Sequence, residues 1–326
     1  MSGPERLGEG FHPEKAAKAL REAVESGQFV VAPGIYDALG ARLAECHGFS
    51  AVYMSGLAVT ASLLARPDIE LLSMEEMVRQ AGLIASAVGI PVIADADTGY
   101  GGLGNVERTT RAYLQAGVGA IHLEDQASPK RCGHLGGVRL VDVDEMCAKY
   151  EVAVATRGDA SMLVIGRTDA FKAAEGGGLD EAIRRGKRIA ETGVDLVFID
   201  GLTQRDHFKR VRDEVEGRLL ASVVEIDAPA QTKAEELREM GYSIAIFALS
   251  GVLSAAGALR RLMSRLAEDG DTDAVFPEMM TYTELNRHVG IDHYHQLWDR
   301  YVPKRRGARK ASAPPVRRKA HEDYED

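Results

Sequence analysis

Residues 129–134, with the sequence PKRCGH, place one cysteine among side chains that carry or can acquire positive charge. Lys130, Arg131 and His134 should favour a thiolate, so we expect the pKa of Cys132 to lie below the free value of about 8.5. Such a thiol exchanges protons near neutral pH and suits a general acid. Cys132, Lys130 and His134 are therefore the predicted catalytic residues. The alternative is an inert, exposed cysteine on a basic turn.

Two carboxylates follow an apolar run in the segment PVIADADTGYG. Asp95 and Asp97 are two residues apart, so on a strand they would point to the same side. Glu124 follows the next apolar run. Oxygen ligands favour Mg²⁺, with Mn²⁺ as a substitute, over zinc. We predict that all three acids bind the metal, Glu124 directly or through water. The alternative is that the acids only cap turns.

The same segment also contains a glycine pattern that is typical of dinucleotide-binding turns. Gly99, Gly101 and Gly104 match G-x-G-x-x-G, and Glu124 lies twenty residues further on. However, two acids precede the first glycine, and they would repel a pyrophosphate. The sequence therefore argues against a dinucleotide site.

Eight short runs rich in β-branched residues recur along the chain, and segments of helical periodicity separate them. In one such segment Leu179, Ile183, Gly186 and Ala190 fall on one helical face. Buried strands that alternate with amphipathic helices form a parallel sheet, and eight units in about 250 residues predict an α/β fold of the (β/α)8 TIM-barrel type.

A barrel of this type builds its active site at the C-terminal ends of its strands. Polar side chains follow six of the eight runs, which is more than capping preferences alone would place there. These residues are Ser55, Asp95 with Asp97, Glu124, Arg167, Asp200 and Glu225.

Two further helical stretches follow the eighth run, one over residues 251–267 and one that begins near Tyr282 and is rich in aromatic residues. Large apolar side chains need a surface to cover, either the chain's own barrel or a neighbouring subunit. We predict one domain over residues 1–303, a barrel with a C-terminal helical extension. Residues 304–326 read as a disordered tail, basic and then acidic, that is idle or binds RNA or an acidic partner.

Charge and hydropathy exclude several classes of protein. The net charge is −9, and setting aside the eight basic and four acidic residues of 304–326 leaves −13 for residues 1–303, which argues against nucleic-acid binding. No apolar run is long enough to span a membrane, so a cytoplasmic protein is expected. Cys46, Cys132 and Cys147 are not spaced for a disulfide framework or a zinc site, and Cys46 and Cys147 are predicted to be buried thiols.

Six segments, in this order, resemble the isocitrate lyase/phosphoenolpyruvate mutase superfamily. They look most like its branch of 2-methylisocitrate lyases, dimethylmalate lyases and carboxyphosphonoenolpyruvate mutases, over about residues 28–265. The resemblance implies a Mg²⁺-dependent barrel and a homotetramer that exchanges C-terminal helices between subunits. The segments are PGIYDALGARL, YMSGLAVTAS, PVIADADTGYG, AIHLEDQASPKRCGHLGG, IGRTDA and GLDEAIRR.

The resemblance also implies roles for individual residues. Ser55, Gly56 and Leu57 would hold the carboxylate of a 2-oxo acid, and Asp68 would lie beside them. Arg167 would bind a substrate carboxylate.

The Mg²⁺ near Asp95, Asp97 and Glu124 would bind the two oxygens of the 2-oxo acid. Cys132 would protonate the carbanion that leaves during cleavage.

Several positions depart from the family pattern. Asp200 stands in place of Glu, Ser222 in place of Asn, Val138 in place of Lys and Ala248 in place of Pro. The predicted substrate-binding set therefore includes Asp200, Ser222 and Glu225, but the part of the site that grips the remainder of the substrate has changed.

The predicted function is a Mg²⁺-dependent carbon–carbon lyase with a small-molecule partner. It would cleave a 2-hydroxy di- or tricarboxylic acid, such as 2-methylisocitrate or an alkylmalate, to a 2-oxo acid such as pyruvate and a carboxylate. The alternatives are a phosphonate-pathway phosphorylmutase, an oxaloacetate-type hydrolase or decarboxylase, and a non-catalytic protein that binds 2-oxo acids.

Overall fold

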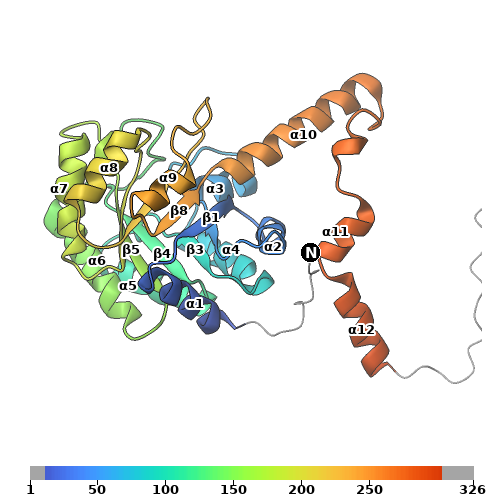
Figure 1. The fold of residues 1–326 in the computed structure, drawn as a ribbon, viewed down its shortest axis with the longest axis horizontal. Helices are drawn as coiled ribbons and strands as arrows, with labels where there is room; N and C mark the ends of the chain where they lie inside the picture. Colours follow the sequence, from blue (N-terminus) through green and yellow to red (C-terminus); the bar gives the residue numbers. More distant parts are fainter. Residues whose placement is uncertain (1–11, 303–326) are drawn as a thin grey trace, which may run out of the picture.

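The eight β-branched runs form eight short parallel strands that close into a barrel in sequence order (Figure 1). The computed structural model describes residues 12–302. Pairing of β1 with β8, where Val30 lies opposite Ile244, closes the barrel and confirms the predicted fold class. The strands are β1 Val30–Ile35, β2 Val52–Met54, β3 Val92–Asp95, β4 Ala120–Glu124, β5 Leu163–Thr168, β6 Leu196–Ile199, β7 Leu219–Ser222 and β8 Ile244–Phe247.

Helices connect the strands and surround the barrel (Figure 1). Several begin at side-chain caps, such as Ser73, which forms a capping box with Glu76 at the start of α4. The helices are α1 Pro13–Glu25, α2 Ala38–Cys46, α3 Gly56–Leu64, α4 Met74–Ala87, α5 Leu103–Ala116, α6 Val143–Arg157, α7 Leu179–Ala190, α8 Arg205–Glu214, α9 Ala234–Glu239, α10 Ser250–Asp269, α11 Tyr282–His288 and α12 Ile291–Tyr301, with 3-10 turns at Ala170–Lys172 and Phe276–Glu278.

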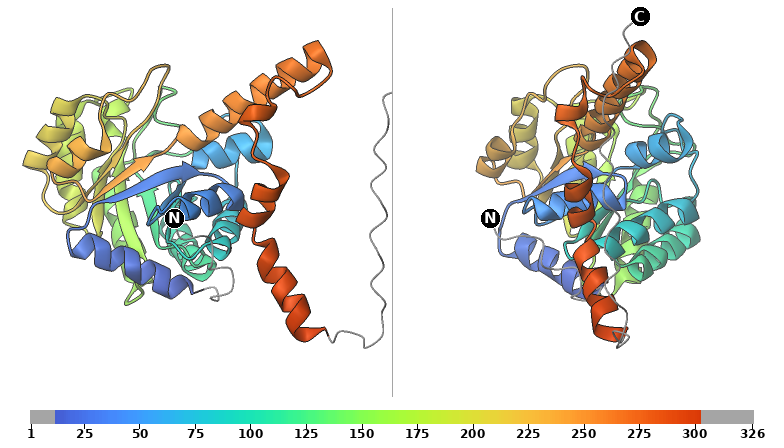
Figure 2. Two further views of the ribbon diagram at one scale, coloured as in Figure 1. Left: turned by 45° about the vertical axis from the view of Figure 1, so that its right-hand side comes forward. Right: turned by 90° about the vertical axis from the view of Figure 1, so that its right-hand side faces the viewer.

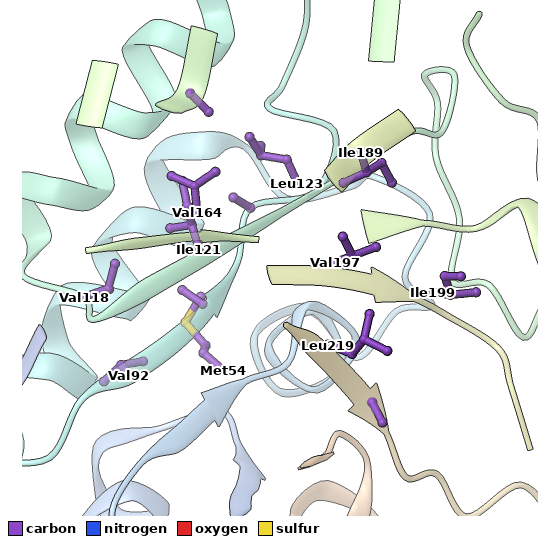
Figure 3. Close-up of a cluster of buried hydrophobic side chains, with 14 of the residues drawn as sticks. Met54, Val92, Val118, Ile121, Leu123, Val164, Ile189, Val197, Ile199 and Leu219 are labelled. Carbon is purple, nitrogen blue, oxygen red and sulfur yellow. The ribbon is translucent and has the colours of Figure 1, made fainter. Parts of the chain in front are cut away.

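Strand side chains alternate between two apolar layers, because successive residues point to opposite faces of a strand. One layer fills the barrel, where Leu20 of α1 joins inward-facing residues such as Ile165 and Phe198. The other layer lies between the strands and the helices. Figure 3 shows Val197 of β6 and Ile189 of α7 within this layer. The barrel is thus a packed core that leaves its C-terminal rim for chemistry.

The C-terminal segment contains the predicted helix near residues 251–267, as α10, but the stretch that begins at Tyr282 forms two helices, α11 and α12. α10 runs outward from the barrel, and α11 and α12 descend beside it as an arm (Figures 1 and 2). Gly290, with φ of 81°, separates α11 from α12. Arg42 of α2 donates a hydrogen bond from Nε to the His288 carbonyl, at 3.1 Å, and so joins α11 to the barrel.

The burial of two cysteines can be compared with the sequence prediction. Cys147 is buried, as predicted, whereas Cys46 is half-buried, because it ends α2 at the protein surface. The predicted tail at 304–326 lies outside the described residues. Among helices within residues 12–302, none combines the length and apolar character that a membrane crossing requires.

Candidate active site

A cavity of about 40 Å³, the central cavity, lies at the C-terminal rim of the barrel. Residues from all but the first strand or its following loop line it, as the strand-end pattern predicts. The predicted residues on its wall are Ser55, Leu57, Asp68, Asp95, Glu124, Lys130, Cys132, His134, Arg167, Asp200 and Ser222.

Arg167 is the central cation of this site. Its guanidinium forms ion pairs with three carboxylates, 2.7 Å from Asp169 Oδ1, 2.9 Å from Asp200 Oδ2 and 3.3 Å from Glu124 Oε2. Its flat face covers the Phe198 ring at 5.3 Å. Packing and hydrogen bonds thus hold the guanidinium in one orientation before a substrate binds.

Lys130 forms a second buried cation centre. Its ammonium group lies 2.8 Å from Asp68 Oδ1 and 2.5 Å from Asp97 Oδ1. Burial by itself would lower the pKa of Lys130, but the surrounding carboxylates outweigh it and raise the pKa well above its ordinary value. Lys130 therefore neutralises acids on the rim and does not stabilise a thiolate as predicted.

Asp95 and Asp97 do not both extend from the strand as predicted. Asp95 ends β3, whereas Asp97 follows the strand with φ of 47° and donates its backbone N–H to Asp95 Oδ1. Burial alone would raise the pKa of Asp95, but the charges of His122, Lys130 and Arg167 lower it to about 2. Burial raises the pKa of Asp97 to about 6, even though Lys130 opposes the shift.

Gly56 lies at the start of α3, directly against Asp95. Its N–H donates to Asp95 Oδ2 at 3.2 Å, and a Cβ at this position would lie only 2.7 Å from the same oxygen. A residue with a side chain would displace the carboxylate. Ser55, one residue earlier, uses its hydroxyl oxygen to accept the Ala58 N–H and so caps the helix.

Cys132 lies on a loop that folds back over the cavity. The loop is anchored where Cys132 N–H donates to the Asp68 carbonyl at 3.0 Å and where Lys130 N–H donates to Glu70 Oε2 at 2.8 Å. Burial raises the pKa of the thiol to about 11, which corrects the prediction of a lowered pKa. The cations that were expected to stabilise a thiolate face elsewhere, so Cys132 carries its proton at neutral pH.

Backbone packing brings this loop very close to the carboxylates. A Cβ on Gly133 would lie 2.9 Å from both Asp169 Oδ1 and Asp200 Oδ2. Burial lowers the pKa of the neighbouring His134, which favours its neutral form. The loop therefore closes on Asp169 and Asp200 only because residue 133 lacks a side chain.

Glu225 and Asp97 are the two predicted strand-end residues that do not line the central cavity. Glu225 lies beyond the end of β7, and its Oε1 accepts a hydrogen bond from the Ser250 hydroxyl at 2.7 Å. Ser250 is the first residue of α10, so this hydrogen bond joins the segment after β7 to the start of α10. The substrate-binding role predicted for Glu225 therefore stays a prediction, without a place on the wall of this cavity.

The carboxylates of the rim suit a hard divalent cation. They offer only oxygen donors, and Glu124 Oε1 is buried without a hydrogen-bond partner. Across residues 12–302, no three His, Cys, Asp or Glu side chains converge closely enough to hold a metal by themselves. A cation here would displace the Lys130 and Arg167 contacts or use water for part of its shell.

Sequence reasoning missed several residues of the site. Asp169 accepts two hydrogen bonds from the Arg167 guanidinium. It follows Arg167 by two residues at the end of β5, and this spacing could have indicated that the two side chains meet. Asp125 lies behind it and accepts the Asp169 N–H at 2.9 Å. Tyr53 and His122 fill the barrel below Asp95 and are joined at 2.9 Å. Both residues lie within apolar runs of the sequence, so nothing in the sequence indicated that they lie beside the site.

Comparisons with known proteins agree with this geometry. The family model for phosphoenolpyruvate phosphomutase matches residues 20–267. The chain is 39% identical to 2,3-dimethylmalate lyase of Eubacterium barkeri, over 89% of this chain and 99% of the relative. It is 37% identical to 2-methylisocitrate lyase of Aeropyrum pernix, over 86% of this chain and 89% of the relative.

A solved structure of phosphonopyruvate hydrolase, in complex with oxalate and Mg²⁺, is also similar. Its TM-score is 0.80 at 31% identity, and the match covers 89% of this chain and 100% of that one. Together these matches confirm the resemblance that the sequence segments indicated. The chain belongs to the phosphoenolpyruvate phosphomutase family and is a carbon–carbon lyase of the isocitrate lyase/phosphoenolpyruvate mutase superfamily.

Proposed function

We propose that the protein cleaves the C2–C3 bond of a 2-hydroxy di- or tricarboxylic acid and releases a 2-oxo acid such as pyruvate. The observation that carries this proposal is the position of Cys132. A protonated thiol lies on the wall of the same small cavity as a fixed guanidinium and a group of buried carboxylates. That combination provides an anion site, a cation site and a proton donor in one place.

In the proposed reaction the 2-hydroxyl group gives its proton to a base in the cavity. The electrons of the O–H bond form the C2 carbonyl, and those of the C2–C3 bond pass to C3. The Cys132 thiol then protonates C3, its thiolate regains a proton from solvent, and the base releases to solvent the proton that it took. Substrate thus becomes a 2-oxo acid and a carboxylic acid, without an oxidant or reductant.

Arg167 would bind a substrate carboxylate, and Ser55 with the backbone of Gly56 and Leu57 would bind the carboxylate of the 2-oxo acid. Mg²⁺, held by Asp95, Asp97 and Glu124 directly or through water, would supply positive charge beside the oxygen of the forming carbonyl. The Mg²⁺ in the similar phosphonopyruvate hydrolase structure supports this assignment.

The experiment that tests the function couples the purified protein and Mg²⁺ to lactate dehydrogenase and NADH. The panel contains 2-methylisocitrate, isocitrate, alkylated malates and oxaloacetate. We expect 2-oxo acid release that EDTA abolishes, that Mg²⁺ restores and that Cys132→Ser lowers by about a hundredfold or more. If no compound of the panel releases a 2-oxo acid, or if Cys132→Ser keeps full activity, the proposal is contradicted.

The proposal includes a homotetramer in which subunits exchange their C-terminal helices. α10 buries none of its residues against its own barrel. The arm exposes large aromatic side chains, including Tyr282 at 82% and Trp298 at 68%. Apolar surface of this extent favours cover by a second copy of the chain.

A further inference from the structure

Arg185 is a buried arginine that no step of the proposed reaction uses. It belongs to α7, on the outer side of the barrel, and only 7% of its surface is exposed. Three of its nitrogens donate hydrogen bonds. Nη1 donates to Asp125 Oδ2 at 3.0 Å, Nη2 donates to the Val141 carbonyl at 3.0 Å and Nε donates to Glu181 Oε1 at 2.8 Å. The guanidinium thus joins α7 to two segments outside its own helix.

Asp125, the buried acid that directly follows β4, uses both carboxylate oxygens. Besides Arg185, Oδ2 accepts the Thr168 hydroxyl at 2.7 Å, and Oδ1 accepts the Asp169 N–H at 2.9 Å. Asp169 in turn accepts two hydrogen bonds from Arg167. Asp125 therefore holds the backbone at the end of β5, from which the substrate-facing guanidinium extends.

The same two residues hold the base of the Cys132 loop, which comprises residues 126–140. The two ends of this loop pair with each other through an antiparallel bridge. Val141, the next residue, donates its N–H to the Asp125 carbonyl at 2.9 Å and accepts the hydrogen bond from Arg185. Arg185 and Asp125 therefore connect the base of the loop that carries the thiol with the strand that carries the guanidinium.

Stability alone does not require two charges in this place. Burial of an ion pair removes the hydration of both groups, and an uncharged pair of similar volume is often as stable. A guanidinium adds a rigid fork of N–H groups, which can bind separate segments in fixed directions. Lysine, a compact charge on a flexible stem, does not supply this geometry. The choice of arginine at position 185 therefore favours a role in positioning.

We propose that Arg185 and Asp125 form a positioning pair, which holds the Cys132 loop and the end of β5 in one arrangement so that the Cys132 thiol and the Arg167 guanidinium face the same substrate. This inference rests on the proposed lyase function and deepens it. Neither member of the pair lines the central cavity, so neither is a catalytic residue.

The first test measures the thiol without a substrate. Arg185→Lys keeps a charge beside Asp125 but loses the fork, so the base of the loop should loosen and admit water to Cys132. The contacts of the loop to Asp68 and Glu70 remain, so the loop should stay folded. Because burial is what disfavours the thiolate, the rate of iodoacetamide labelling at Cys132 at pH 8 should rise by about tenfold.

Arg184→Lys is the matched control. Arg184 is the neighbouring residue of α7, is exposed and pairs with Glu181 at the surface. The same substitution there should leave the rate of Cys132 labelling unchanged.

Steady-state kinetics give a second readout. In Arg185→Lys we expect KM to rise, because Arg167 loses part of its support, and kcat to fall, because the thiol is placed less well. Together these changes should lower kcat/KM by about tenfold to a hundredfold. Arg184→Lys should keep the kinetics of the wild type.

A double variant separates positioning from stability. Arg185→Met combined with Asp125→Asn removes both charges, so no unpaired charge stays buried and the urea midpoint of unfolding should change little. The double variant should still show faster labelling of Cys132 and a lower kcat/KM. A pair with a purely structural role would leave both at their wild-type values.

The outcomes separate this inference from the proposed function. If an active lyase shows wild-type labelling, or wild-type kcat/KM, in Arg185→Lys and in the double variant, the positioning pair is overturned and the lyase function stands. If the wild type cleaves no compound of the panel while labelling is faster in both variants, the lyase function is overturned and the hold of the pair on the Cys132 loop is supported.

Discussion

Arg167 and Asp169, two residues apart at the end of β5, are joined by two hydrogen bonds. Arg167 Nε donates to Asp169 Oδ2 at 3.0 Å, and Nη2 donates to Oδ1 at 2.7 Å. Asp125 in turn accepts the Asp169 N–H and the Thr168 hydroxyl. The Arg167 guanidinium is therefore held by Asp169, and Asp169 is itself hydrogen-bonded to Asp125.

The first prediction concerns the hydrogen bonds from Arg167 to Asp169. Asp169→Asn places an amide against the guanidinium and removes one charged partner, so we expect KM to rise by about tenfold to a hundredfold and kcat to change less. Steady-state kinetics on the best substrate measure both parameters. Asp180→Asn, which removes an exposed partner of Arg210, is the matched control and should change neither. Equal losses in kcat and kcat/KM would contradict a positioning role.

Gly133 gives a second prediction. The Cβ of Gly133→Ala would meet two carboxylate oxygens at 2.9 Å, so the Cys132 loop should no longer close and turnover should fall by about tenfold or more. Gly104→Ala is the control, because a Cβ there has no atom within 4 Å. Turnover and circular dichroism of both variants check this. Wild-type turnover in Gly133→Ala would show that close packing of the loop is unnecessary.

The protonation of Cys132 can be measured by alkylation. Because burial raises the thiol pKa to about 11, the thiolate fraction should grow about tenfold per pH unit below that value. The rate of iodoacetamide labelling at Cys132, followed by peptide mapping, should therefore increase about a hundredfold from pH 8 to pH 10. Cys132→Ser identifies the labelled peptide. A rate that is already constant above pH 8 would indicate an acidic thiol and reverse our correction.

His122 gives the protein a defined acid sensitivity. Burial lowers its pKa to about 4, so between pH 6.5 and 4 the unfolded chain binds a proton that the folded protein does not. The contribution to stability is complete above pH 6.5, falls as pH decreases and reaches a loss of about 3 kcal/mol near pH 4.

Urea unfolding of wild type and His122→Gln at several pH values tests this prediction. The free energy of unfolding of the variant should depend less steeply on pH, by about one proton. Parallel curves for the two proteins would show that His122 does not contribute.

The arm supplies the last prediction. If α11 and α12 cover another subunit, Trp298→Asp should shift the protein to a smaller assembly in sedimentation velocity, because a charge would replace a large apolar contact. Ala155→Asp, on the exposed side of α6, should leave the sedimentation coefficient unchanged. An unchanged sedimentation coefficient of Trp298→Asp would show that the arm does not contribute to the contact between subunits.

The local pattern of the sequence determined the barrel and most of the rim. β-branched runs at regular spacing specify buried parallel strands, and the polar residues that follow six of these runs must reach the same end once the strands are parallel. Arg167, Glu124 and Asp200 were found in this way. Glu225 follows the same pattern, but its carboxylate accepts a hydrogen bond from Ser250, a contact that the spacing of the runs does not predict.

Electrostatic states were decided only by the tertiary structure. The charges next to Cys132 in sequence suggested an acidic thiol, but Lys130 pairs with Asp68, more than sixty positions away, and Asp97. The folded loop removes the thiol from water, and desolvation outweighs the remaining charges. Residue spacing specifies which groups reach the rim, whereas burial and long-range contacts set their charge and the space beside them.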